Sequence, residues 1–215
     1  MTEAVIQFEY RLDPPAPGAA AAAAAMTPVL RAAQALGIVG RDPGRYDGLA
    51  FGNLSWGRAG GFWITATQTA DKPVLGEDDV VLIEDFAIEQ NRVSARGALP
   101  PSSEALSHAA LHARRHGAPT WVLHGHHPGL WQEDGRADLP VTDPAAANGT
   151  VAMARAVAAA GGGGSGLVIM GGHRDGVIAY AADADGVLAE LRAALERLSR
   201  TDNQPTPGSP HARRR

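Results

Sequence analysis

The chain has no cysteine, few aromatic residues and no long apolar run. The lack of cysteine excludes disulfides, thiolate nucleophiles and sulfur-based zinc sites, so any metal must bind to His, Asp or Glu. Aromatic residues make up only 5% of the chain, so the core must be built from Ala and branched aliphatic side chains. No stretch of about 18 strongly apolar residues is present to span a bilayer, and the N-terminus has no signal-peptide core. We therefore expect a cytoplasmic protein that does not enter a membrane.

Concentrated positive charge is also missing. The formal net charge is -4, the sequence pI is near 6.0, and the only dense basic run is Arg213 to Arg215. This pattern lacks the electrostatic footprint of a nucleic-acid-binding protein. A small anionic ligand would have to be held by local groups. The length of 215 residues suits one domain with a well-buried core.

Helical and β-prone segments are spread over most of the chain and predict an α/β fold. We expect helices at 19–36, 102–116, 148–160 and 184–199, and β-prone runs at 49–56, 61–67, 80–83, 86–88, 120–123, 167–170 and 176–181. The first two runs suit a hairpin, and the third and fourth a second pair with a turn at Glu84 and Asp85. Residues 1–18 are expected to form an N-terminal extension, 19–200 the folded domain and 201–215 a disordered tail.

The clearest local motif is Trp-Val-Leu-His-Gly-His-His at 121–127. In a strand, alternate residues point to the same side, so His124 and His126 would project together and could bind one metal ion, while His127 would face away. The alternative is a solvent-facing histidine cluster in a turn before Pro128.

A metal site would need a third ligand. The candidates are His173 and Asp175, which lie in a Gly-Gly-His-Arg-Asp-Gly segment after an apolar run. The alternative is a simple β-turn, which the segment taken alone fits slightly better.

Glu104 follows Ser102 and Ser103 at a predicted helix start. It could be an ordinary helix-start carboxylate, or, beside a metal, a group that moves a proton while the serines and free N–H groups bind an anion. His108 and His112 follow Glu104 at intervals of four on the same face, and such a pair can itself bind zinc. Neighbouring arginines favour a partly solvated helix instead.

Five segments, in order, resemble the class II aldolase/adducin family. The resemblance runs from about residue 25 to residue 195 and rests on Gly-Asn-Leu-Ser at 52–55, Ile-Thr-Ala-Thr at 64–67, Pro-Ser-Ser-Glu at 101–104, Val-Leu-His-Gly-His at 122–126 and the late Gly-His segment. It implies an α/β fold with a central, mainly antiparallel sheet flanked by helices, so that residues 19–200 would be one class II aldolase/adducin-like domain. It also implies a homo-oligomer, expected to be a tetramer.

The resemblance implies a role for each candidate residue. Glu104 would be the catalytic acid/base, and His124, His126 and His173 would bind a divalent metal ion, with zinc expected. The residues implied to hold a substrate phosphate are Gly52, Asn53, Thr67, Ser102 and Ser103.

Two departures from the family pattern bear on these roles. Gln68 stands where members usually have Gly, and its side chain could crowd or replace a backbone contact to phosphate. Arg174 and Asp175 stand between His173 and Gly176, where members have His-Gly, so either His173 or Asp175 could be the third ligand.

The implied activity is that of a metal-dependent lyase of the aldolase type. Its substrate would be a small sugar phosphate or hydroxy-carbonyl compound, cleaved through a metal-stabilised enediolate. The alternatives are an epimerase or dehydratase of the same family, or a non-catalytic adducin-like interaction domain. Retention of Glu104, His124 and His126 argues against the last alternative, and the altered segment after His173 argues for it. The expected partners are a small-molecule substrate and further copies of the chain, with no nucleic acid and no membrane.

Overall fold

The computed structural model describes residues 5–114, 120–132 and 138–202. The strands are β1 (Glu9–Asp13), β2 (Gly40–Arg41), β3 (Ala50–Phe51), β4 (Asn53–Arg58), β5 (Gly61–Thr65), β6 (Val80–Ala87), β7 (Arg92–Arg96), β8 (Trp121–His126), β9 (Gly166–Ile169) and β10 (Gly176–Ala181). The helices are α1 (Ala19–Ala35), α2 (Ala105–Arg114), α3 (Pro128–Trp131), α4 (Val151–Ala160) and α5 (Ala184–Asp202), with 3-10 turns η1 (Tyr46–Gly48), η2 (Glu77–Asp79) and η3 (Ile88–Gln90).

Eight of these strands form one sheet in the order β1-β7-β6-β5-β4-β8-β10-β9, and β2 pairs with β3 in a small second sheet. Within the large sheet only β1 and β7 run parallel, and the other neighbours are antiparallel. The expected α/β fold with a mainly antiparallel central sheet is confirmed. Strand β8 lies inside the sheet between β4 and β10, so the segment with the histidine motif is held on both edges.

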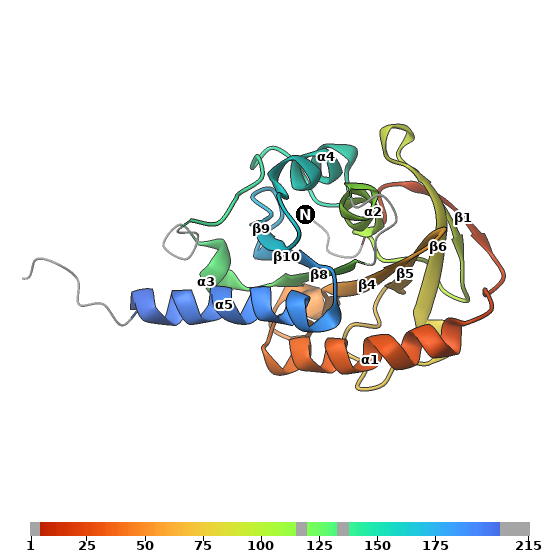
Figure 1. Ribbon diagram of the computed structural model, residues 1–215, viewed down its shortest axis with the longest axis horizontal. Coiled ribbons are helices and arrows are strands. Elements are labelled where there is room, and N and C mark those ends of the chain that lie inside the picture. Colours follow the sequence, from red (N-terminus) through yellow and green to blue (C-terminus); the bar gives the residue numbers. More distant parts are fainter. Residues whose placement is uncertain (1–4, 115–119, 133–137, 203–215) are drawn as a thin grey trace, which may run out of the picture.

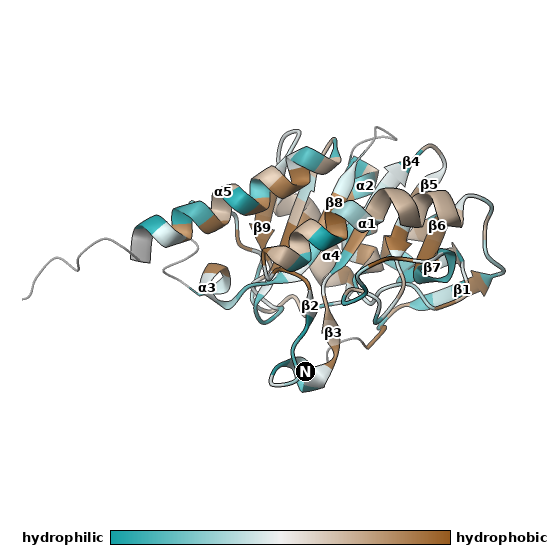
Figure 2. Ribbon diagram, turned by 90° about the horizontal axis from the view of Figure 1, so that it is seen from below, coloured by the Kyte–Doolittle hydropathy of each residue, from teal (hydrophilic) through white to brown (hydrophobic). Residues whose placement is uncertain are grey.

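Helices cover both faces of the sheet (Figure 1). α2 and α4 lie on one face, and α1 and α5 lie on the other. Figure 2 looks onto the face that carries α1 and α5, where α5 alternates hydrophilic and hydrophobic bands along its length. Such an amphipathic pattern is typical of a helix that buries one side on a sheet and exposes the other.

The core matches the composition, because α1 packs on the sheet mainly through small side chains. Ala22, Ala23, Met26, Leu30 and Ala33 of α1 are all at most 1% exposed. Small side chains allow close approach of a helix to a sheet, and the contact area compensates for the scarcity of aromatic residues. Among the described residues, none of the helices is both long and apolar enough to pass through a membrane.

The predicted second hairpin is wrong. β6 continues from Val80 to Ala87 through the charged pair Glu84 and Asp85, and the register shifts between Ile83 and Asp85. A bulge therefore accommodates the charged residues where a turn was expected, because a bulge lets a strand keep its pairing while it bends. On the edge away from β5, β6 pairs with β7, a strand that was not predicted.

Other boundaries also differ from expectation. The segment expected as an N-terminal extension contributes the edge strand β1. The first β-prone run is divided at Gly52, whose φ of 83° is left-handed. Residues 201 and 202, expected to belong to the tail, are the end of α5. The rest of the expected tail, and the expected end of the second helix at residue 116, lie outside the described residues.

Candidate metal centre

Two histidines of the site project from the same side of β8. His124 and His126 are each 1% exposed, and they alternate with Gly125 as strand geometry requires. A Cβ added at Gly125 would lie 2.4 Å from the Ile38 carbonyl oxygen, and that same oxygen accepts a hydrogen bond from the His126 N–H at 2.8 Å. Gly125 thus lets the chain before β2 pack against the back of β8, which fixes the two histidines from behind.

The third histidine comes from the tight turn between β9 and β10. The His173 N–H donates to the Met170 carbonyl and the Gly176 N–H donates to the His173 carbonyl, each at 2.9 Å. Gly172 passes so close to the Ala146 carbonyl that an added Cβ would lie 1.9 Å from it. The turn is a real β-turn, as the simple interpretation expected, and it also directs His173 toward β8.

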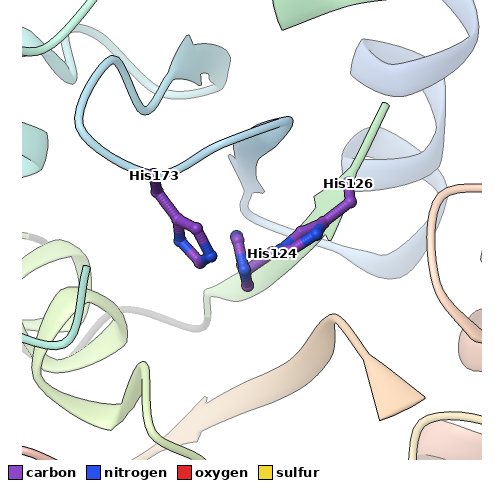
Figure 3. A group of neighbouring side chains, drawn as sticks. All are labelled: His124, His126 and His173. Carbon is purple, nitrogen blue, oxygen red and sulfur yellow. The ribbon is translucent and has the colours of Figure 1, made fainter. Parts of the chain in front are cut away.

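The three imidazole rings face one another (Figure 3). The ring centroids of His124, His126 and His173 are 4.8–5.1 Å apart, and one possible ligand atom from each lies within 4.8 Å of the others. Among the described residues, no other group of three His, Cys, Asp or Glu side chains has this arrangement.

The protonation of these rings suits a metal ion. The His124 Nδ1 lies 3.0 Å from the Val177 carbonyl oxygen, so this nitrogen carries the proton and Nε2 remains as the ligand atom. Burial, together with the neighbouring His173 and His126, lowers the pKa of His124 well below its usual value. Burial, His173 and Arg45 lower the pKa of His126 in the same way. Neutral imidazoles are the form that binds a divalent metal, so the residues present fit such an ion.

A carboxylate lies beside this cluster. Glu104 is 1% exposed at the start of α2, and its Oε1 is 3.6 Å from the His173 Nδ1. The Ser107 hydroxyl donates to Glu104 Oε2 at 2.9 Å. Its position at a helix start agrees with the simple interpretation of Glu104, and the same position places it next to the histidines.

One small recess contains nearly all of the sequence-predicted site residues. Gly52, Asn53, Thr67, Ser102, Ser103, Glu104, His124 and His173 all line it, together with Ala50, Phe51, Ala66 and Gln68. His126 belongs to the histidine cluster but does not line the recess. The structure therefore brings together residues that are up to 121 positions apart in the sequence, from Gly52 to His173.

Asp175 points away from the cluster. Its Oδ2 accepts a hydrogen bond from the Tyr46 hydroxyl at 2.7 Å and lies 3.4 Å from the Arg45 guanidinium. Burial and the neighbouring Asp175 raise the pKa of Tyr46, so the phenol stays protonated and donates. The Tyr46 ring packs edge-on against His126, with centroids 4.6 Å apart, and Phe51 stacks on His126 at 5.6 Å.

Sequence reasoning missed Arg45, Tyr46 and Phe51, because they lie in or beside an irregular loop with no metal-ligand pattern. Three non-glycine residues near this contact have left-handed backbone, namely Tyr46, Asp47 and Asp175, with φ between 51° and 63°. Such conformations cost free energy and are concentrated at functional sites. They are the one signal that marks this loop, and only the structure reveals them.

The other histidines within the described residues have different roles. The Ser55 hydroxyl lies 2.7 Å from His108 Nδ1 and 2.8 Å from His112 Nε2, so these two rings share a hydroxyl and not a metal ion. His127 faces away from the cluster, as expected, and its Nδ1 accepts from the Leu130 N–H at the start of α3.

A family model describing the class II aldolase and adducin N-terminal domain matches residues 44–201. The chain belongs to the class II aldolase and adducin family. The match covers every residue that lines the recess and all three histidines. A search among curated proteins finds no match for this family member.

Solved structures with the same fold include several aldolases. The L-fuculose-1-phosphate aldolase from Thermus thermophilus is 19% identical, with 83% of this chain and 89% of that chain covered and a TM-score of 0.51. The sugar-phosphate aldolase from Thermotoga maritima is 15% identical, with 85% and 96% covered and a TM-score of 0.58. YgbL from Escherichia coli, described with three alternative activities as an aldolase, epimerase or decarboxylase, is 14% identical, with 88% and 92% covered and a TM-score of 0.63. At these identities the likeness shows a shared fold.

Class II aldolases are typically enzymes that use a divalent metal ion, and this member of the family has a histidine triad in which such an ion fits.

Proposed function

We propose that the chain is a divalent-metal-dependent lyase of the aldolase type, which acts on a small sugar or hydroxy-carbonyl compound. The observation that carries the proposal is the buried Glu104 carboxylate, 3.6 Å from an imidazole of the three-histidine cluster. Zinc is the expected ion, because three neutral imidazoles are a common ligand set of catalytic zinc sites.

The proposed ligands are His124, His126 and His173. Asp175 is not among them, and its proposed role is to hold Tyr46, whose ring packs against His126. An ion held there supplies Lewis-acid stabilisation for the negative charge that develops when a carbon–carbon bond next to a carbonyl breaks. Burial of the histidines excludes water and strengthens this electrostatic effect.

Glu104 is the proposed acid/base. Its Oε2 accepts the Ser107 hydroxyl, and its Oε1, 3.6 Å from the His173 Nδ1, is the proposed atom that takes up and returns a proton. A buried carboxylate in this position is held in one orientation, which favours transfer to a substrate in the adjoining recess.

The alternative functions differ in how much of this proposed site they would use. An epimerase or dehydratase would use the same stabilised negative charge and the same carboxylate, and YgbL is described with aldolase and epimerase among its alternatives. The non-catalytic alternative was based on the altered segment after His173. His173 nevertheless faces the other two histidines, which supports an enzyme.

The test combines metal content with activity. Wild-type protein is expected to hold about one divalent ion per chain, measured by elemental mass spectrometry. His124→Ala should lose the ion, whereas His127→Ala, the matched control on the opposite side of the chain, should keep it. Glu104→Gln should keep the ion but lose about 10²–10⁴-fold in turnover, because the proton carrier is gone.

Turnover would be measured by a screen of ketose 1-phosphates and their unphosphorylated analogues for cleavage, epimerisation and dehydration. A wild-type protein that holds no ion, or whose turnover is unchanged by chelation or by Glu104→Gln, would contradict the proposal.

A further inference from the structure

The recess beside the histidine cluster is very small. Its volume is about 20 Å³, which is roughly the space that one water molecule needs. A phosphoryl group carries three oxygens around phosphorus and is bulkier than one water molecule, whereas a single hydroxyl oxygen is of similar size.

Gln68 lines the recess. Its Oε1 accepts a hydrogen bond from the Ala50 N–H at 2.9 Å, and its Nε2 donates to the Ala50 carbonyl at 3.1 Å. Both ends of the amide are therefore used, and the side chain is tied to Ala50 of β3, which also lines the recess. Gln68 has a φ of 60°, a backbone conformation that glycine adopts far more easily. Moving the side chain aside would break both of these hydrogen bonds.

One backbone donor of the neighbouring loop is not available to an anion. The Thr67 N–H donates to the Pro100 carbonyl at 3.0 Å, so this donor is already used within the protein.

An acceptor inside the recess favours a neutral group. Asn53 is 5% exposed, and its Oδ1 is buried without a hydrogen-bond partner among the described residues. This oxygen requires a donor. A hydroxyl provides one, whereas a phosphate near neutral pH is mostly ionised and acts as an acceptor.

We infer that Gln68 determines specificity by excluding a phosphoryl group, so that the substrate is an unphosphorylated hydroxy-carbonyl compound whose terminal hydroxyl occupies the recess. Two proteins of the same fold are named for sugar phosphates, so this chain would differ from them in substrate class. The inference rests on the proposed function, because it assumes that substrate enters this recess.

The test is calorimetric titration of metal-containing protein with inorganic phosphate, and separately with dihydroxyacetone phosphate and dihydroxyacetone. Wild-type protein should bind dihydroxyacetone phosphate no more tightly than dihydroxyacetone. Gln68→Gly, which relieves the left-handed backbone while it opens the recess, should bind phosphate and the phosphorylated ketone at least tenfold more tightly than wild type. Gln68→Ala should change both affinities in the same direction, and it serves if the glycine variant is poorly folded.

Gln34→Ala is the matched control. Gln34 also donates two hydrogen bonds to backbone carbonyls, those of Ala70 and Lys72, but it does not line the recess. Its phosphate affinity should equal that of wild type. Any bound ion is common to these variants, so it cancels in the comparison.

A wild-type preference of tenfold or more for the phosphorylated ketone would overturn the inference, as would equal phosphate affinity in wild type and both Gln68 variants. Both results concern binding alone, so they leave the proposed function standing if the Glu104 and His124 variants behave as expected. Absence of binding of either ketone by any of these proteins would contradict the inference together with the proposed function.

Discussion

At the scale of single residues, the buried histidines fall into two groups that differ in the surroundings of their rings. His124, His126 and His173 face one another, whereas His108 and His112 share the Ser55 hydroxyl. Burial lowers the pKa of His112 to about 3. Burial, and then the neighbouring His112, also lowers the pKa of His108 well below its usual value. These two rings stay neutral in the folded protein far below the pH at which they become protonated in the unfolded chain.

This difference makes stability depend on pH. Above about pH 7 the rings are neutral in both states, so they contribute no pH dependence. As the pH falls below about 6.5, only the unfolded chain takes up these protons, and each such group removes about 1.4 kcal/mol of unfolding free energy per pH unit. For His112 this loss continues down to its folded pKa of about 3.

We expect His112→Gln to flatten this dependence. Urea denaturation at pH 7.5 and pH 5.0 should show a fall in unfolding free energy that is smaller by about 2 kcal/mol in the variant, because one buried neutral ring is gone. If the variant and wild type lose the same amount between these two pH values, His112 is protonated to the same extent in both states and the prediction is wrong.

The sequence predicted much of the site at this scale, but not its details. The alternation of residues in a strand was enough to expect His124 and His126 on one side. The choice between His173 and Asp175 depended on a turn whose direction is set by contacts with Ala146 and Tyr46, far away in the sequence. The bond between Gln68 and Ala50 is equally non-local, and no local pattern encodes it.

At the scale of elements, β8 is held in position by a close contact with the chain at Ile38, which Gly125 permits. The His126 N–H reaches the Ile38 carbonyl because Gly125 has no side chain on that face. The positions of His124 and His126 therefore depend on contacts made by the opposite side of the strand.

Gly125→Ala should displace β8. The added methyl would meet the Ile38 carbonyl, and overpacking of this kind costs about 1–3 kcal/mol of unfolding free energy. We expect thermal or urea denaturation to report that loss and elemental analysis to report weaker ion retention. Gly162→Ala is the matched control, because an added Cβ there meets nothing within 4 Å. Equal stability of the two variants would show that β8 can shift without cost.

The elements themselves were predicted unevenly, for physical reasons. Helices and buried strands have strong periodicity and were found close to their observed positions. β7 does alternate, with buried Val93 and Ala95 between polar residues, but it is short and was overlooked. β1 has only weak burial and gains its place by parallel pairing with β7, a partner that sequence does not reveal. The bulge in β6 was mistaken for a turn because charged residues suit both.

At the scale of the whole molecule, an ion that binds only the folded chain stabilises it by mass action. At an ion concentration about 100 times the dissociation constant, the gain is about 2.7 kcal/mol, and each kcal/mol corresponds to about 2–4 °C in a domain of this size. We expect the unfolding midpoint to rise when metal-free protein is reloaded with zinc, as measured by differential scanning calorimetry. His124→Ala should show no such rise. A rise of the same size in that variant would mean that zinc stabilises the protein from another site.

The homotetramer implied by the family resemblance stays a prediction.

The hydrogen bond between Tyr46 and Asp175 spans 129 positions of the sequence. During synthesis, His124 and His126 leave the ribosome well before His173, and before Val177, whose carbonyl fixes the His124 ring. Until β10 has paired with β8, the nascent chain carries two of the three histidines without the turn that brings the third. The cluster therefore cannot be complete before the turn between β9 and β10 has formed, and an ion bound by all three histidines would mark a chain whose folding has reached β10.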